Sequence, residues 1–262
     1  MYDLPERRAE TDALWTAIAA RLDAEGVAAP GRLDRGRELA AIWTDPALLL
    51  AQTCGYPFAT VLNGRVRLVA TPRYRAPGCA GARYRSAVVV RAGDPARRLA
   101  DCEGYRPAVN DARSQSGHQA LRAALAEARI GLGPAIGTGA HRASIEAVVA
   151  GGADLAAIDC VTFALLGDAA PGLVAGVRAI AWTSPTPGLP LVTASATDEA
   201  TRAALGRALD AVAADPALAG VRAALRIVDF ARPDAADYAV LAERARALDA
   251  RGAPRLLLDQ KS

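Results

Sequence analysis

The most informative stretch of the sequence is Val109-Asn110-Asp111-Ala112-Arg113-Ser114-Gln115-Ser116-Gly117-His118, which joins the end of an expected strand to the start of an expected helix. Ligands of open α/β sheets bind beyond the carboxyl ends of the strands, and a helix N-terminus offers backbone N–H donors at the positive end of the helix dipole. Two serine hydroxyls and a glycine at such a point are typical of an anion-binding turn. An ordinary serine N-cap explains this motif alone equally well.

A second glycine-rich turn, Gly137-Thr138-Gly139, opens the next expected helix at residues 140–150. His141 lies in the first turn of that helix, where its imidazole can donate a hydrogen bond to a ligand oxygen. A histidine at this position is more often a capping or surface residue. Asp159 follows the expected strand at 153–158, and we expect it either to contact a ligand or to cap the helix after it.

Outward from these turns, expected strands and helices alternate along the chain. Strands are expected at 66–70, 84–91, 106–109, 136, 153–158, 177–182 and 191–194, and helices at 11–26, 36–43, 116–128, 140–150, 160–166, 198–214 and 234–251. This alternation predicts an α/β fold with a mostly parallel sheet and helices on both faces. The proline-rich segment 184–190 is the best candidate for a domain boundary.

The composition argues against a nucleic-acid partner and against a metal site. The 31 basic and 28 acidic residues give a net charge of +3, and the arginines form no dense basic block. Three Phe, three Trp and six Tyr are too few for a base-stacking platform. The four cysteines include no C-x-x-C pair, and the only histidines are His118 and His141, so we expect no metal and no cofactor. The cysteines are expected to be partly buried thiols, with a Cys54–Cys79 bridge left open.

The N-terminal residues 1–8 are polar and lack the apolar core of a secretory signal. No stretch approaches the roughly 18 apolar residues of a membrane span. The sequence as written therefore predicts a cytoplasmic protein. A periplasmic location is the alternative if the true start lies upstream.

Four motifs, in this order, resemble the phosphonate-binding family of ABC-importer substrate-binding proteins. They are Tyr-Arg-Ser before a Val-rich strand (84–86), Asn-x-x-x-Ser-x-Ser-Gly (110–117), Gly-Ala-His-Arg-Ala-Ser-Ile-x-Ala-Val (139–148) and Ala-Asp-Leu-Ala-Ala-Ile-Asp (153–159). Their order and spacing are more specific than any single motif, and the resemblance covers roughly residues 40 to 195.

The resemblance implies a type II periplasmic-binding-protein fold. Such a fold has two α/β lobes, each a mostly parallel sheet flanked by helices, joined by two hinge strands with the ligand in the cleft. Lobe I would comprise residues 1–84 and 184–262, and lobe II residues 85–183. Binding would proceed by hinge closure.

The resemblance also implies the binding residues. In this family the Ser-x-Ser-Gly helix start holds phosphonate or phosphate oxygens, a role that falls on Ser114, Ser116 and Gly117, with Gln115 adding a backbone donor. The histidine that opens the next helix corresponds to His141. If its charged form binds the ligand, His141→Ala costs most at low pH.

Three further site residues follow from the same resemblance. The acid after the Ala-Ala-Ile strand corresponds to Asp159, which would hold an amino group of the ligand. A tyrosine presented to the cleft by the first lobe corresponds to Tyr56, and Tyr84 at the first crossing between the lobes is another candidate.

The implied function is binding of a small anionic ligand, either phosphonate, phosphate or a related oxyanion, without catalysis. The implied partner is an ABC permease, with a regulatory partner as the alternative. The chain departs from the family pattern in three ways. It shows no signal peptide, no β-strand at its start, and no complete match to the acids that grip an aminoalkyl ligand.

Three other functions compete with this interpretation. A hydrolase would use Ser114 or Ser116 with His141 and Asp159, but the serines lack the leading glycine of the G-x-S-x-G elbow. An enzyme of cofactor biosynthesis on the same fold would need nucleophile patterns that the sequence does not show. A cytoplasmic ligand sensor would need a separate partner, because the sequence carries no DNA-binding or signalling module.

Overall fold

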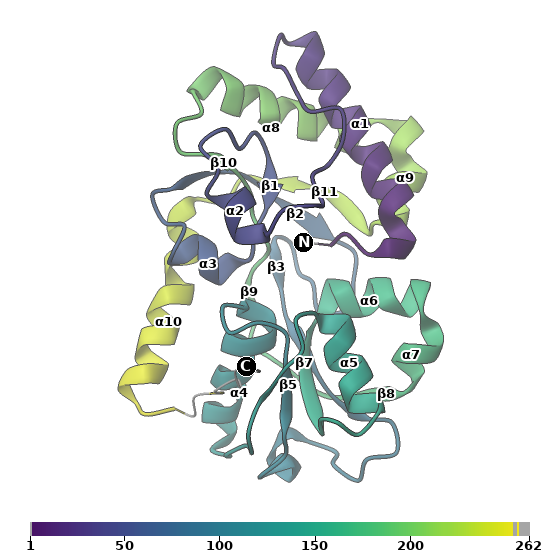
Figure 1. Ribbon diagram of the computed structural model, residues 1–262, viewed down its shortest axis with the longest axis vertical. Helices are drawn as coiled ribbons and strands as arrows, with labels where there is room; N and C mark the ends of the chain where they lie inside the picture. The colour runs from purple at the N-terminus through teal and green to yellow at the C-terminus, as the bar shows by residue number, and fades with distance from the viewer. Residues whose placement is uncertain (1, 254–255, 257–262) are drawn as a thin grey trace. The chain divides into compact units, whose positions relative to one another are not determined.

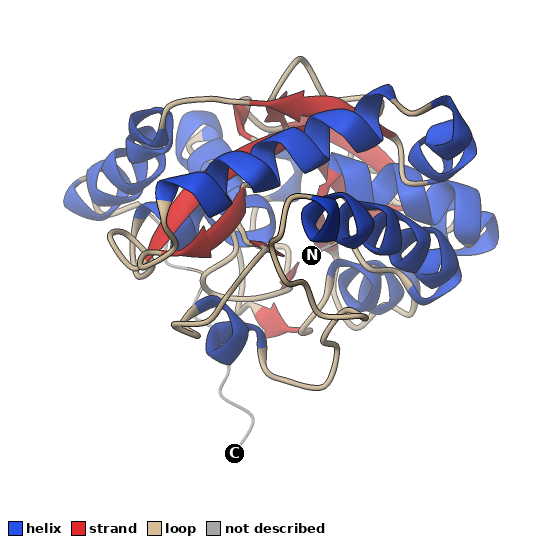
Figure 2. Cartoon of the chain, turned by 90° about the horizontal axis from the view of Figure 1, so that it is seen from above, coloured by secondary structure: helices blue, strands red, loops and turns tan. Residues whose placement is uncertain are grey.

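The computed structural model describes residues 2–253 and residue 256. The chain divides into two compact units. Unit 1 combines the N-terminal segment up to Arg75 with Pro187–Tyr238, and unit 2 combines Ala76–Thr186 with the segment that begins at Ala239. Helices and strands occur in both units, so the predicted α/β class is confirmed. Figure 2 draws the helices of the chain in blue and its strands in red.

Unit 1 contains a four-stranded sheet in the order β1-β10-β2-β11. The strands are β1 (Ala51–Gln52), β2 (Val66–Tyr74), β10 (Leu191–Ala194) and β11 (Ile227–Ala231). The helical segments of this unit are η1 (Pro5–Arg7), α1 (Arg8–Ala24), α2 (Leu39–Trp43), α3 (Gly55–Ala59), α8 (Glu199–Ala214), η4 (Pro216–Leu218), α9 (Ala219–Ala224) and η5 (Ala235–Tyr238).

The core of unit 1 lies between its sheet and the helices α1, α8 and α9, which run along it in Figure 1. Helix α1 buries the four residues that share one face at helical spacing, Leu14, Trp15, Ile18 and Leu22. These side chains pack with residues of β2 and α8, including Val69 and Leu205. The amphipathic helix expected near the start of the chain is therefore confirmed.

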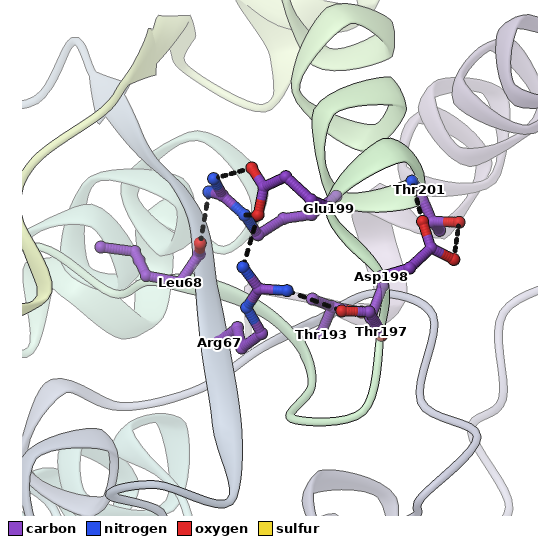
Figure 3. A network of polar contacts seen from close by, with 8 residues as sticks. Arg67, Leu68, Thr193, Thr197, Asp198, Glu199 and Thr201 are labelled. Carbon is purple, nitrogen blue, oxygen red and sulfur yellow. Dashed lines mark hydrogen bonds and ion pairs between the residues drawn. The ribbon is translucent and has the colours of Figure 1, made fainter.

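A network of charged and polar groups ties β2 to the start of α8 (Figure 3). Arg67 on β2 donates to the carbonyl of Thr197 over 2.6 Å and to the carboxylate of Glu199 over 2.5 Å. Arg202, one turn further along α8, also donates to Glu199. Asp198 caps the helix by accepting from the backbone N–H of Thr201 over 2.7 Å.

Unit 2 contains a five-stranded sheet in the order β6-β5-β7-β4-β8. The strands are β4 (Ser86–Arg91), β5 (Pro107–Val109), β6 (Ile136–Gly137), β7 (Leu155–Asp159) and β8 (Val177–Trp182). A further two-stranded sheet pairs β3 (Arg83–Tyr84) with β9 (Thr186–Pro187), where the chain passes from unit 2 back to unit 1.

The helical segments of unit 2 are η2 (Leu99–Cys102), η3 (Gln115–Gln119), α4 (Ala120–Ala128), α5 (His141–Val149), α6 (Cys160–Ala169), α7 (Pro171–Ala175) and α10 (Ala239–Ala250). Helix α4 lies on one side of the sheet and α5 to α7 on the other (Figure 1). Alternate residues of β4 follow this arrangement, because Val88 and Val90 pack with Leu121 and Leu125 of α4.

The expectation of mostly parallel sheets is wrong for unit 1. In unit 1 the strand pairs β1–β10, β10–β2 and β2–β11 are all antiparallel. In unit 2, β5 pairs in parallel with β6 and β7, and β4 pairs antiparallel with β7 and β8. The physical reason is that hydrophobic pattern marks a strand without giving its direction. In unit 2 the strand–helix–strand connections from β5 to β8 give β5, β6, β7 and β8 one common direction, and β4, placed between β7 and β8, runs against them.

The last helix also differs from the expectation. The sequence-based division assigned residues 184–262 to lobe I, whereas the structure groups α10 with unit 2. Helix α10 packs on α4, and Arg122 of α4, itself buried, donates to Asp249 of α10 over 2.7 Å. The same unit includes Leu256 in its core.

Candidate functional site

The candidate site lies at one edge of the sheet in unit 2. Strand β5 pairs in parallel with both of its neighbours, with Val109 opposite Gly137 and Ala108 opposite Ala156. The carboxyl ends of β5, β6 and β7 therefore meet at the same edge. Ser114 lies in the turn after β5, His141 begins the helix after β6, and Asp159 is the last residue of β7. This is the position where open α/β sheets place their ligands.

The turn after β5 leads into η3, a single π-helical turn that continues directly into α4. The backbone N–H of Gln119 donates to the carbonyl of Ser114, five residues earlier, over 3.1 Å. The Ser114 hydroxyl accepts from the backbone N–H of Gly117 over 3.0 Å. Ser114 is therefore the N-cap of this helix, and the widened turn after it is of a kind that often occurs at functional sites.

Two hydrogen-bonding side chains connect the starts of two helices. Ser116 Oγ, in η3, lies 2.9 Å from His141 Nε2, in the first turn of α5. Ser114 Oγ lies 3.4 Å from Ser116 Oγ. The two serines are 5% and 4% exposed and His141 is half-buried, and the three side chains form one polar cluster, here called the Ser–His cluster.

Gly117 fits the Ser–His cluster only because it has no side chain. A Cβ at this position would lie 1.9 Å from Asn110 Oδ1 and 3.2 Å from His141 Cε1. Carbon and oxygen atoms cannot approach to the first of these distances. The glycine therefore lets Asn110, at the end of β5, pack directly against the start of the helix.

Two residues that the sequence analysis did not assign to the site hydrogen-bond to the two helices that carry the Ser–His cluster. Ser86 Oγ, at the start of β4, donates to the carbonyl of Ser116 over 3.0 Å, and its backbone N–H donates to Thr183 Oγ1. Thr138 Oγ1, before α5, lies 2.6 Å from Ser144 Oγ within that helix. Ser86 lies in the motif Tyr-Arg-Ser, and Asn110 lies in the motif Asn-x-x-x-Ser-x-Ser-Gly. Both residues could therefore have been assigned to the site from these motifs.

The imidazole of His141 is neutral at pH 7. Burial lowers the pKa of His141 to about 4, because an apolar surrounding disfavours the charged ring. In the neutral ring Nε2 can either accept from the Ser116 hydroxyl or donate to it. This pKa belongs to the ligand-free protein, so the expected low-pH effect of His141→Ala stays a prediction.

Asp159 ends β7 and caps α6. Its Oδ1 accepts from the backbone N–H groups of Val161 and Thr162 over 2.8 and 2.9 Å, and the residue is 1% exposed. It lies opposite Ser86 in the register of β7 and β4. Of the two expected roles, the helix cap is the one that the structure shows, and the contact with a ligand amino group stays a prediction.

The other three predicted site residues are placed as follows. Gln115 is buried in η3 and lines a groove between η3, α4 and α10. Tyr84 is buried in β3 of unit 2. Tyr56 is half-buried in α3 of unit 1, and its place with respect to the Ser–His cluster stays a prediction. The structure thus brings together Ser114, Ser116, Gly117 and His141.

The comparison with protein families decides between the competing interpretations. A model of the family described as "ABC transporter, phosphonate, periplasmic substrate-binding protein" matches residues 48–238. The chain belongs to this family. Members of this phosphonate-binding family are solute-binding proteins and not enzymes. Their ligands are small anions, their partner is an ABC permease, and their usual location is the periplasm.

Several solved structures have a fold similar to that of this chain. PhnD1 from Prochlorococcus marinus in complex with methylphosphonate has a TM-score of 0.75 and 14% sequence identity, covering 92% of this chain and 94% of that one. A binding protein component of an ABC phosphonate transporter from Pseudomonas aeruginosa has a TM-score of 0.71 and 15% identity, covering 92% and 82%. A protein of Xanthomonas citri bound to ATP has a TM-score of 0.70 and 16% identity, covering 93% and 94%.

These structural likenesses show the fold. No curated protein matches the sequence. Among the described residues of this phosphonate-binding family member, no helix has both the length and the apolar character needed to span a bilayer.

Proposed function

We propose that the Ser–His cluster of unit 2 binds the phosphonate or phosphate group of a small anionic ligand. The observation that carries this proposal is the 2.9 Å contact between Ser116 Oγ and His141 Nε2, which joins the starts of two helices at the carboxyl edge of the sheet. Ser114, Ser116 and Gly117 would hold the ligand oxygens, with a backbone N–H donor from Gln115. This arrangement gives an anion both hydroxyl donors and the positive ends of two helix dipoles.

The remaining predicted residues have subsidiary roles in this proposal. Asp159 would interact with an amino group of the ligand while its Oδ1 caps α6. Tyr84 and Tyr56 would contact the part of the ligand beyond the phosphorus. The relative that was solved with methylphosphonate makes this small molecule the first candidate ligand, and the relative bound to ATP makes a larger phosphate ester the second.

The proposed partner is an ABC permease that receives the ligand, as the family description indicates. The comparisons give no support to a cytoplasmic ligand sensor or an enzyme of cofactor biosynthesis. The cytoplasmic location predicted from the sequence also has no support and stays a prediction, whereas the family's usual location is periplasmic. Fractionation of the native organism, with an antibody against this chain, would distinguish the two compartments.

Calorimetric titration with methylphosphonate, inorganic phosphate and ATP tests the proposed ligand. The variant Ser116→Ala removes one donor to a charged ligand group, which typically costs about 1.5–3 kcal/mol of binding free energy. We therefore expect the affinity to fall by a factor of about 10 to 150. Ser195→Ala, at an exposed position of unit 1, is the matched control and should bind like the parent chain.

Two results would contradict the proposal. If none of the three compounds binds to the parent chain, the ligand class is wrong. If one of them binds and Ser116→Ala binds it as tightly as Ser195→Ala does, the ligand site is elsewhere.

A further inference from the structure

Two cysteine thiols of unit 2 lie in contact. Cys79 Sγ and Cys160 Sγ are 3.4 Å apart, and both cysteines are free thiols in this structure. Cys79 ends a turn in which its backbone N–H donates to the carbonyl of Ala76 over 3.0 Å. Cys160 is the first residue of α6, and its backbone N–H donates to the carbonyl of Arg85 over 3.1 Å. The contact therefore joins two segments whose backbones are held in place independently.

The turn that contains Cys79 is packed tightly against the start of α6. Gly78 has a φ of +97°, and a Cβ at this position would lie 3.0 Å from Cys160 Cβ and 2.7 Å from Trp182 Cζ3. A glycine is thus required both by the backbone conformation and by the close approach. Because a disulfide has a sulfur–sulfur length of about 2.05 Å, closing the pair needs only a shift of about 1.4 Å between the sulfur atoms.

The two thiols differ in reactivity. A hydrogen bond with Cys160 lowers the pKa of the Cys79 thiol, whereas the same bond together with burial raises the pKa of Cys160. Cys79 is also the more accessible of the two, because Cys160 is 1% exposed and Cys79 is half-buried. The thiolate is the nucleophile in disulfide exchange, so Cys79 reacts first with an oxidant.

We infer that Cys79 and Cys160 form a redox-active pair that closes to a disulfide within unit 2. The oxidant is a small disulfide such as oxidised glutathione. The Cys79 thiolate attacks one sulfur of this disulfide, forms a mixed disulfide and releases one glutathione thiolate. Cys160 then loses its proton and attacks Cys79 Sγ, which releases the second glutathione. The two protein thiols lose two electrons and two protons in total, and the oxidant takes up both.

Closing the pair would stabilise the folded chain, because the bond links residues 81 positions apart and reduces the freedom of the unfolded chain. We expect the midpoint of thermal unfolding to rise by about 5–10 °C. The bond would also fix the start of α6 beside its cap, Asp159. The inference does not depend on the proposed ligand, since it concerns the thiols alone.

Peptide mapping of the folded parent chain tests the bond directly. The protein is incubated with oxidised or reduced glutathione, remaining thiols are blocked with iodoacetamide, and the protein is digested with trypsin without reduction. Cleavage at arginine places Cys79 on the peptide 76–83 and Cys160 on the peptide 143–178. We expect these two peptides as one linked species after oxidation, and as two separate alkylated peptides after reduction.

The controls use the other two cysteines. Cys79→Ala and Cys160→Ala should each lose the linked species and the gain in thermal stability, whereas Cys54→Ala and Cys102→Ala should keep both. Cys102 is buried and its pKa is raised to about 11 by burial, so it should not react. The inference is overturned if oxidised protein yields alkylated peptides 76–83 and 143–178, or if Cys79 is found linked to Cys54.

Discussion

Gly117 shows how a single missing side chain shapes the candidate site. Asn110 Oδ1 occupies the space that a Cβ of Gly117 would take, at a distance of 1.9 Å. The end of β5 and the start of η3 can therefore approach each other closely enough for Ser116 to reach His141. The backbone of Gly117 does not lie in the left-handed region, so packing and not backbone conformation makes glycine necessary here.

Gly117→Ala should weaken ligand binding more than Ser116→Ala does. The added methyl group forces Asn110 away and moves the helix start, which displaces two hydroxyl groups at once, while overpacking of this kind costs about 1–3 kcal/mol of stability. Calorimetric titration with the ligand found for the parent chain, together with thermal unfolding, measures both effects. Gly167→Ala in α6, where a Cβ has no heavy atom within 4 Å, is the matched control. Parent-like affinity of Gly117→Ala would contradict the close approach that the structure shows.

His141 should take up a proton when an anion binds beside it. The pKa of the buried ring is about 4, and a nearby negative charge favours the charged form and raises this pKa in the complex. A complex that binds more protons than the free protein is favoured as the pH falls. The affinity of the parent chain should therefore increase, relative to that of His141→Asn, as the pH is lowered from about 8 to about 5.

Titration of both proteins with the same ligand at several pH values measures this ratio. The protonation of the ligand itself affects both proteins equally and cancels from the ratio. A ratio that does not change with pH would show that His141 stays neutral in the complex, so that it contacts the ligand only as a neutral donor or only holds Ser116 in place.

At the residue scale, the sequence motifs identified the three residues of the Ser–His cluster. They did not identify Ser86, which hydrogen-bonds to the carbonyl of Ser116. Ser114, Ser116 and His141 follow strand ends in recognisable glycine-containing turns, and a local pattern is enough to find them. Ser86 contributes through a hydrogen bond to Ser116, 30 positions further along the chain. That contact depends on the position of β4 in the sheet, which no local pattern encodes.

At the scale of elements, the start of α8 shows how charge secures a helix to a strand. Hydrogen bonds from Arg202 and Arg67 lower the pKa of Glu199 to about 2. A carboxylate with a lowered pKa stabilises the fold above its ordinary pKa, near 4.5, and this contribution is lost as the pH falls through about 2. Because the carboxylate is exposed, the contribution is expected to be small.

Glu199→Gln should therefore lower the thermal midpoint slightly at pH 7, and the difference from the parent chain should shrink as the pH falls from 4.5 to about 2. Scanning calorimetry across this pH range measures the difference. Glu127→Gln, on the exposed surface of α4, is the control. Its difference in thermal midpoint from the parent chain should not decrease as the pH falls. A difference that is the same at both ends of the range would mean that the charge of Glu199 does not stabilise the helix start.

Most elements were predictable from the sequence, and their directions were not. Strand β8 and strand β10 have the predicted bounds of 177–182 and 191–194, and the helices α5, α6 and α8 begin within a residue of their predicted starts. Strand β11 was missed, although Ile227, Val228 and Phe230 give it β-branched and aromatic residues. Its place beside β2 depends on a pairing across more than 150 positions, for example Asp229 with Arg73.

At the scale of the whole molecule, the family match and the two-unit division agree with the predicted architecture of two α/β lobes. Sequence reasoning located the return of the chain near the prolines at 184–190, because proline ends regular structure. It did not place α10, because an amphipathic helix can pack on either lobe. In the structure α10 contacts α4, and this contact includes the Arg122–Asp249 ion pair. No local sequence pattern predicts this contact.

The order of the strands has a consequence for synthesis on the ribosome. All strands of the five-stranded sheet of unit 2 lie between Ser86 and Trp182, so they are available for pairing before the last third of the chain has been made. Strand β2 of unit 1, by contrast, is made early and pairs with β10 and β11, which emerge more than 100 residues later. Long-range pairing of this kind is slow. During translation, the inserted middle segment can become compact first, while the unpaired edges of β2 stay open to solvent or to a chaperone until the C-terminal strands arrive.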